Sequence, residues 1–405
     1  MGQVFVGHDW AEIHHDIYIE DADGARLGKG RVPDGIEGVA RFHEMLADTG
    51  AEPGDVVVAT ETDRGLFVGA MVAAGYQVLA VNPLSVARYR QRHSTSGAKS
   101  DPGDAYLLAE IARLDRHNHR PVAGDSELVE AIKVLARSHQ SLIWTRQRQT
   151  NQLRSTLREF YPSALAAFDS LASGDALAVL GIAPTPALGR GLSRSKIAAA
   201  LRRGGRSRRV EERAVEIQQA LRTPHLEAPA VVADAMGATV TALVAVIAEL
   251  QAQTARLEAV LADRFDQHPD AKIIRSLPGL GMTLGARVLA EFGDDPNRYG
   301  TAKSRKNYAG TSPITRASGK HRVVLARYAR NKHVANACYL WAFTSITHSP
   351  GARAFYDQHR ARSDTHNQTL RALANRWVGI LHGCLTNGTP YNEHTAWAHR
   401  TDLAA

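Results

Sequence analysis

Cysteine is nearly absent from this 405-residue chain, which contains only Cys338 and Cys384. So few cysteines cannot form the disulfide framework of a small secreted protein, and a reducing cytoplasm fits better. The cysteines and the 18 histidines also lack the spacing that is typical of a zinc site. We therefore expect the His14-His15 pair and the histidines of His117-x-His119 to be surface residues.

Targeting signals and long hydrophobic runs are missing as well. The first ten residues, MGQVFVGHDW, have no basic segment followed by an apolar one, so they are not typical of a secretory signal. The most apolar stretch, residues 228–250, is interrupted by Asp234 and Thr241, and we expect no membrane span. No Walker loop or dinucleotide-binding fingerprint appears either.

Basic residues outnumber acidic ones, with 49 Lys and Arg against 41 Asp and Glu, a net charge of +8. Residues 190–213 alone hold nine Lys or Arg and two acids, and further basic groups lie within 137–158 and 316–332, whereas the first 65 residues are rich in acids. A metal site beside a polyanion track would need this separation of charge, so the pattern favours nucleic acid as a partner. The alternative is that these charges are ordinary solvated helix faces.

The first 120 residues predict a mixed α/β domain. Three strands come first, joined by a hairpin at Asp23-Gly24, and helices then alternate with strands. This is the order of the ribonuclease-H-like fold. The expected strands cover residues 3–9, 15–19, 25–32, 55–60 and 76–81, and the expected helices cover 35–48, 65–74 and 101–114.

Residues 121–271 predict a helical region. One amphipathic helix spans 126–160, helical pieces follow over 163–228, and a heptad pattern of apolar residues then begins. The pattern fits a coiled coil, either with the 126–160 helix of the same chain or with a second protomer. Its two rows of residues, each spaced by seven, are Met236, Leu243, Leu250 and Leu257, and Val240, Ile247, Thr254 and Leu261.

Residues 272–385 predict a mainly helical C-terminal domain, followed by a tail over 386–405. The string SLPGLGMTLGARVLAEFG at 276–293 is typical of a helix-hairpin-helix element, in which glycines allow a tight turn. The backbone N–H groups at the start of the second helix could then hold a phosphate.

Four carboxylates could form a metal site. Asp9 and Glu61 each stand at the end of an expected strand, where neighbouring strand ends converge, and Asp101 and Asp104 share one face at a helix start. Such hard oxygen donors could hold two Mg²⁺ ions about 4 Å apart, activating an attacking oxygen and stabilising a leaving one. Alternatively, Asp101 or Asp104 could simply cap its helix, and Asp63 could replace Glu61.

The motifs GHDWAE, ATETDRG and KSDPGDAYLLAEIAR around these carboxylates resemble those of the DEDD insertion-sequence transposases, the IS110 family. RSLPGLGMTLGARVLAEFGD and NYAGTSPITRASGK resemble the second domain of the same family, so that the resemblance covers about residues 1–160 and 270–385. The chain departs from the family at His8, where an aliphatic residue usually precedes the Asp, and at Arg64, where a Gly is usual.

This resemblance implies a fold, an activity and partners. The N-terminal domain would be similar to the Holliday-junction resolvase RuvC, and the C-terminal domain would carry a nucleophilic serine, here Ser318. Asp9, Glu61, Asp101 and Asp104 would bind Mg²⁺, with Mn²⁺ as a possible substitute. The enzyme would recombine donor and target DNA in the bacterial cytoplasm at the nucleoid, guided by a structured RNA that the element encodes.

Ser318 stands in the basic, glycine-containing segment Thr315-Arg316-Ala317-Ser318-Gly319-Lys320. A serine hydroxyl must be activated to attack a phosphodiester, and Arg316, Lys320 and Arg322 could stabilise the phosphate charge. Ser304 and Ser312 are nearby alternatives.

Three functions follow from these features: a strand-exchange enzyme that uses both sites, a hydrolytic junction nuclease that uses only the carboxylates, and a non-catalytic nucleic-acid scaffold. Because recombination cuts several strands, we expect a homodimer or a tetramer on DNA.

Overall fold

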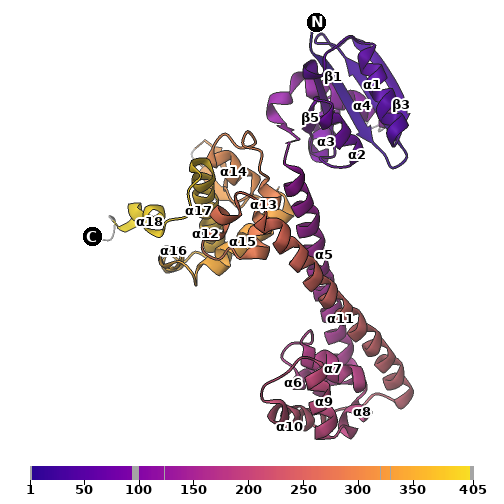
Figure 1. Ribbon diagram of the computed structural model, residues 1–405, viewed down its shortest axis with the longest axis vertical. Helices are drawn as coiled ribbons and strands as arrows, with labels where there is room; N and C mark the ends of the chain where they lie inside the picture. The colour runs from indigo at the N-terminus through magenta and orange to yellow at the C-terminus, as the bar shows by residue number, and fades with distance from the viewer. Residues whose placement is uncertain (1, 94–99, 123, 320, 329, 402–405) are drawn as a thin grey trace. The chain divides into compact units, whose positions relative to one another are not determined.

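The computed structural model describes residues 2–93, 100–122, 124–319, 321–328 and 330–401. The chain forms two compact units (Figure 1). The N-terminal unit comprises Met1–Asp125 with Asp295–Arg298, and the helical unit comprises Ser126–Asp294 with Tyr299–Ala405. A mixed α/β region is therefore followed by a largely helical one, as the sequence predicts.

The N-terminal unit is built on one sheet with the strand order β3-β2-β1-β4-β5-β6. The first three strands are antiparallel neighbours, β1, β4 and β5 run parallel, and β6 is antiparallel to β5. Five of these strands were predicted, whereas the two-residue β6 is too short to leave a pattern. The strands are β1 (Val4–Trp10), β2 (His14–Glu20), β3 (Arg26–Pro33), β4 (Val56–Thr60), β5 (Gln77–Ala80) and β6 (Arg120–Pro121).

Helices cover both faces of this sheet. Because side chains alternate along a strand, Val4 and Val6 join one core with α1 (Ile36–Ala47) and α2 (Leu66–Ala73). Phe5 joins the core on the other face, with α3 (Pro83–His93) and α4 (Asp101–Leu114). The sequence analysis did not predict α3, which carries an arginine of the candidate site.

A pair of long helices forms the spine of the helical unit. α5 (Glu127–Phe160) packs along α11 (Ala230–Asp266), and Ser126 caps α5 by accepting a hydrogen bond from the Val129 N–H at 3.2 Å. The row of α11 that is buried throughout is Val240, Ile247, Thr254 and Leu261. Thr254 satisfies its hydroxyl by donating to the Leu250 carbonyl at 2.6 Å. The heptad pattern therefore has an intrachain partner, one of the two that the sequence left open.

By length and composition alone, α11 could cross a membrane, and only 28% of its most apolar window is buried. This qualifies the expectation that no segment is apolar enough, because Asp234 and Thr241 do not make the helix as a whole polar. A core helix passes the same test, and α11 packs against both α5 and α7.

Five short helices at one end of this pair surround a separate apolar core. They include most of the basic segment 190–213, in which five of the nine Lys and Arg side chains form ion pairs with described carboxylates. Arg202, Arg206 and Arg213, for example, pair with Glu211, Asp175 and Glu216. The helices are α6 (Pro162–Ala167), α7 (Gly174–Ile182), α8 (Pro186–Gly191), α9 (Arg194–Arg203) and α10 (Val210–Leu221).

The C-terminal helices pack around two stacked tryptophans, Trp341 and Trp377, and a two-stranded ribbon accompanies them. The predicted hairpin at 276–293 is confirmed: Gly279 turns the chain with φ 84°, and a Cβ there would lie 2.6 Å from Thr344 Oγ1. The elements are α12 (Ala271–Ser276), α13 (Met282–Phe292), α14 (Ala302–Tyr308), β7 (Ile314–Ser318), β8 (His321–Leu325), α15 (Lys332–Ser345), α16 (Pro350–Ala361), α17 (His366–Asn387) and α18 (Glu393–Thr401).

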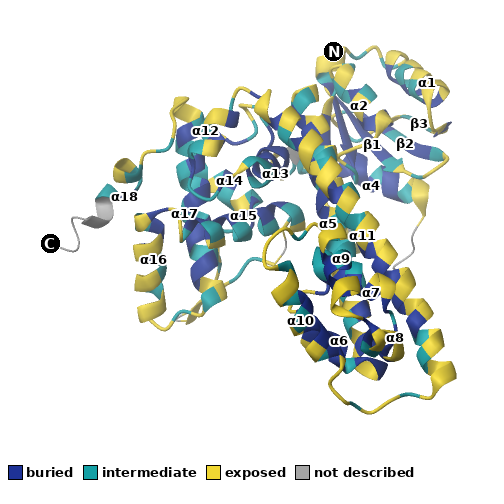
Figure 2. Ribbon diagram, turned by 60° about the horizontal axis from the view of Figure 1, so that its bottom comes forward, coloured by how far each residue is buried: buried dark blue, intermediate teal, exposed yellow. Residues whose placement is uncertain are grey.

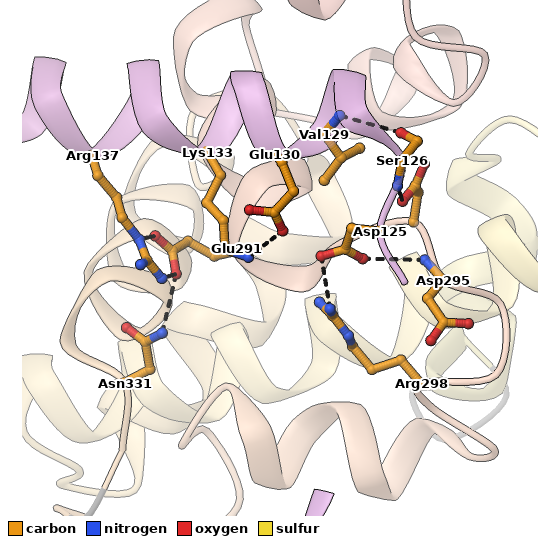
Figure 3. A network of polar contacts seen from close by, with 11 residues as sticks. Asp125, Ser126, Val129, Glu130, Lys133, Arg137, Glu291, Asp295, Arg298 and Asn331 are labelled. Atoms are coloured by element: carbon orange, nitrogen blue, oxygen red, sulfur yellow. Dashed lines mark hydrogen bonds and ion pairs between the residues drawn. The ribbon is translucent and has the colours of Figure 1, made fainter. Parts of the chain in front are cut away.

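An ion pair on a buried carboxylate holds α13 to α5 (Figure 3). Arg137 donates from Nε and a terminal nitrogen to the two oxygens of Glu291, at 2.9 and 3.1 Å, and Asn331 donates to the same carboxylate at 3.1 Å. Arg137 belongs to the basic group at 137–158, but Glu291 neutralises its charge within the protein.

Candidate functional site

The sheet brings Asp9 and Glu61 to one edge of the N-terminal unit. β1 and β4 are parallel neighbours, and their last paired residues are His8 and Thr60. The residues that follow this pair are Asp9 in β1 and Glu61 directly after β4. Alternation along the strands directs both toward the face that α4 covers, and the first turn of α4 contributes Asp101 and Asp104.

A glycine allows α4 to lie close to the sheet. A Cβ at Gly7 would come within 1.7 Å of the Ala105 carbonyl oxygen and 2.6 Å of the Ala109 nitrogen. No side chain fits there, so Gly7 sets the distance between β1 and the start of α4. That close approach is what brings Asp104 near Asp9.

The carboxylates raise one another's proton affinity. The pKa of Asp9 rises to about 7, because burial removes water and because Asp104, Glu61, Asp101 and Asp16 add negative charge. Three of the predicted carboxylates therefore lie close enough to the fourth, Asp9, to raise its pKa. A cation among them would relieve the repulsion.

Asp101 and Asp104 differ in their surroundings. Asp104 is buried and pairs with Arg90 of α3, whose Nε donates to it at 3.1 Å. Asp101 is exposed, 4.0 Å from a terminal nitrogen of Arg31. Neither caps α4, because the Ser100 hydroxyl accepts the Gly103 N–H at 3.3 Å. The alternative that these aspartates are only caps is therefore wrong.

Asp16 is a fifth carboxylate, which the sequence analysis missed. It lies opposite Asp9 in the β1–β2 pairing, and Arg31 donates to both of its oxygens, at 3.2 and 2.8 Å. Ligand atoms of His14, Asp16 and Asp101 lie within 4.8 Å of one another. The signal was available, because pairing the two predicted strands across their short turn places Asp16 beside Asp9.

A buried histidine network lies on the opposite face of the same strands. His8 contacts Thr60 Oγ1 through Nδ1 at 3.0 Å and His15 through Nε2 at 3.1 Å, and His15 reaches Asp34 at 3.1 Å. Burial, with a contribution from His15, lowers the pKa of His8 to about 3. The expectation that His15 is a surface residue is wrong, because its strand directs it into the core beside Phe67. His8 packs where the family usually has an aliphatic residue.

Ser318 belongs to the helical unit, in a ribbon instead of the expected loop. It is the exposed last residue of β7 and pairs with His321, the first residue of β8. The pair Arg316–Val323 lies two positions away, so Arg316 shares a face with Ser318 and His321, whereas Arg322 lies on the other face. Lys320 lies outside the described residues. His321 is a further candidate that the sequence analysis missed.

The two alternative serines have different surroundings. Ser304 has a structural role, because it completes a capping box with Thr301 at the start of α14. Ser312 precedes the ribbon, and its carbonyl accepts a hydrogen bond from Arg327 Nε at 3.3 Å.

Comparisons with known proteins agree with these motifs. A transposase profile of the DEDD IS110 type matches residues 6–162, and a profile described as "Transposase IS116/IS110/IS902 family" matches residues 271–357. The chain is 43% identical to the mini-circle putative transposase for IS117 of Streptomyces coelicolor, over 99% of this chain and 98% of the relative.

Two further relatives come from other insertion elements. An uncharacterized 42 kDa protein of IS900 from Mycobacterium paratuberculosis is 29% identical over 98% of each chain. An uncharacterized 44.8 kDa protein of IS116 from Streptomyces clavuligerus is 29% identical over 94% of each chain. Full-length similarity at 43% identity, together with two family profiles in the expected order, settles the assignment: the chain belongs to the IS110/IS116 family of transposases, enzymes that cut and rejoin DNA.

Proposed function

We propose that this transposase is a metal-dependent serine recombinase that moves an insertion sequence under the guidance of a structured RNA. The observation that carries the metal site is the convergence of Asp9, Glu61, Asp101 and Asp104, expressed in the raised pKa of Asp9. Nuclease sites that hold cations are built from carboxylates in this way. The strand order of the N-terminal sheet supports a RuvC-like domain.

The residues fit a divalent cation. Carboxylate oxygens are the ligands that Mg²⁺ and Mn²⁺ prefer. A bound cation would lower the raised pKa of Asp9, because it would offset the negative charge of the neighbouring carboxylates. Asp9, Glu61, Asp101 and Asp104 would hold the ion, with Asp16 next to them. When bound, the ion would stabilise the charge that builds up on a phosphate. Arg90 and Arg31 partly neutralise the cluster when no ion is bound.

Ser318 would act as the nucleophile on the DNA strand. Its Oγ would lose its proton and form a bond to phosphorus, while the bond from phosphorus to a deoxyribose oxygen breaks and that oxygen takes up a proton. The reverse reaction with a hydroxyl of another strand would rejoin the DNA without ATP, because the phosphoserine conserves the bond energy. Arg316, on the same face, would stabilise the phosphate, and His321, directly opposite Ser318, would accept the serine proton.

A covalent adduct tests this assignment. The wild-type protein incubated with labelled element ends and Mg²⁺ should yield a protein–DNA species that survives denaturation, and Ser318→Ala should abolish it. Ser312→Ala is the matched control and should retain the adduct. Strand cleavage without any adduct would instead support the hydrolytic nuclease, and no Mg²⁺-dependent cleavage would support the scaffold.

Arginines of α5 that pair with no described carboxylate support a surface for the RNA on this helix. Four arginines in the second half of α5, Arg146, Arg148, Arg154 and Arg158, form no ion pair with any described residue, whereas much of segment 190–213 is neutralised. We therefore expect α5 to contribute more to RNA affinity. Replacing the four arginines with Gln should weaken RNA binding and flatten its dependence on salt, because fewer counterions are released. Changing Arg202 and Arg209 should matter less.

Assembly as a homodimer or tetramer belongs to the same proposal. Parts of α11 are exposed (Figure 2). Its exposed apolar residues lie on a different face from the buried row and include Val231, Val246 and Val260. A second protomer packing on this face would bring two copies of each centre to one DNA. We place the assembly in the cytoplasm at the nucleoid, where the DNA is.

A further inference from the structure

A cavity of about 1110 Å³ in the helical unit has no role in the mechanism above. Its walls come from α14, β8, α16, α17 and the segment 389–396. Cavities that hold small ligands measure roughly 300–1,000 Å³, so this one is large enough for a nucleotide. It is a feature of one compact unit, which gives it a fixed lining.

The lining attracts anions. It contains four cations and no carboxylate among the described residues: Lys306, Arg327, Arg371 and Arg376. Arg376 is held over the Trp397 ring, 4.6 Å from its centroid, and a terminal nitrogen of its guanidinium donates to the Ala396 carbonyl oxygen.

The rest of the lining suits a nucleobase. Amide side chains can donate and accept along the edge of a base, and aromatic rings can stack on its face. A bare phosphate would need neither. The amides are Gln368, Asn375, Asn387 and Asn392, three of which already accept a hydrogen bond within the protein through their oxygen, and the ring that can stack is Tyr391.

The cavity also lies at the base of the Ser318 ribbon. Leu325 lines it and pairs with Ile314, four residues along β7 from Ser318. At about 3.3 Å per residue the separation is roughly 13 Å. A base-paired DNA strand advances about 3.4 Å per nucleotide and an unpaired one advances further, so the cavity lies within about four nucleotides of the serine.

We propose that this cavity accepts an unpaired nucleotide of the DNA strand on which the enzyme acts, with its phosphate on the cations and its base among the amides and Tyr391. The proposal rests on the proposed role of Ser318 only for the spacing along the strand. Extruding a base is least costly in a strand that is already unpaired, as strands are during exchange.

A cavity-filling variant separates this site from general attraction to DNA. Gly383 of α17 lines the cavity, and a Cβ there meets nothing within 4 Å, so Gly383→Leu fills the space without changing the charge. Gly69→Leu, at an exposed helical glycine that is equally open, is its control. Arg371→Gln removes a lining cation, and the exposed Arg362→Gln is its control.

The full-length proteins would be titrated in EDTA against one labelled sequence, as a single strand and as a duplex, by fluorescence anisotropy. Gly383→Leu and Arg371→Gln should weaken single-strand binding roughly 5- to 150-fold, as expected for one stacked base. Duplex affinity should change little, and both controls should bind like the wild type.

Single-strand affinity that Gly383→Leu leaves within twofold, or a wild-type protein that does not bind single strands, would overturn the proposal. A variant that keeps its DNA affinity but changes its oligomeric state would assign the cavity to a second protein chain, which also overturns it. No cleavage is needed in this assay, so a failure of the serine mechanism would not change its result.

Discussion

The charge on Asp9 should make the metal-free protein less stable as pH rises. Its pKa is raised from 3.8 to about 7 in the folded state, so folding binds a proton between these values, and the stability that this proton provides is lost as pH increases through that window. Asp9→Asn has no such loss. In EDTA, its melting temperature should exceed that of the wild type by more at pH 8 than at pH 5, as differential scanning fluorimetry can measure. A difference that is constant with pH would contradict the assignment.

A substitution at Asp104, a second residue of the cluster, tests catalysis without disturbing the fold. Asp104 is buried against Arg90, so Asp104→Asn keeps the shape of the side chain and removes the charge that a cation needs. We expect loss of Mg²⁺-dependent strand cleavage in a gel assay, with the circular dichroism spectrum unchanged. The exposed Asp63→Asn should cleave normally, since Asp63 was only an alternative to Glu61. Normal cleavage by the Asp104 variant would remove Asp104 from the metal site.

At the scale of elements, the packing of α4 on β1 depends on Gly7, which has no side chain. Gly7→Ala would place a Cβ 1.7 Å from the Ala105 carbonyl oxygen, and a backbone atom cannot move aside as a flexible side chain can. Overpacking of this kind costs roughly 1–3 kcal/mol and sometimes more. Urea denaturation should show a loss of at least that size, whereas Gly54→Ala, where the space is open, should be nearly neutral. Equal stabilities would mean that α4 is not fixed by this contact.

The elements themselves were predictable where their periodicity was strong. Runs of consecutive apolar residues indicated β1 and β4, and the Asp23-Gly24 hairpin indicated the strands on either side of it. The four predicted carboxylates converge because parallel strands end at one sheet edge, beside the start of α4. Contacts that depend on register needed one further step: the positions of Asp16 and His15 follow only when the two predicted strands are paired across their short turn. The heptad of α11 predicted a partner helix without identifying it, since α5 and a second protomer would bury the same residues.

At the scale of the whole molecule, the two candidate centres belong to different compact units, with Asp9, Glu61, Asp101 and Asp104 in one and Ser318 in the other. A recombinase that exchanges strands must coordinate several such centres. The exposed apolar residues of α11 offer a face on which a second copy could pack.

If one reaction centre combines the carboxylates of one protomer with the serine of another, two inactive chains should complement each other. Mixing Ser318→Ala with Asp104→Asn would then produce pairs in which an intact serine meets intact carboxylates, and recombination of matched ends should partly recover. Each variant alone should remain inactive, because every centre would lack one group. Co-assembly must be verified independently, by pulling down one tagged variant with the other. A mixture as inactive as its components, despite co-assembly, would mean that each protomer completes its own centre, with its serine and carboxylates meeting within one chain.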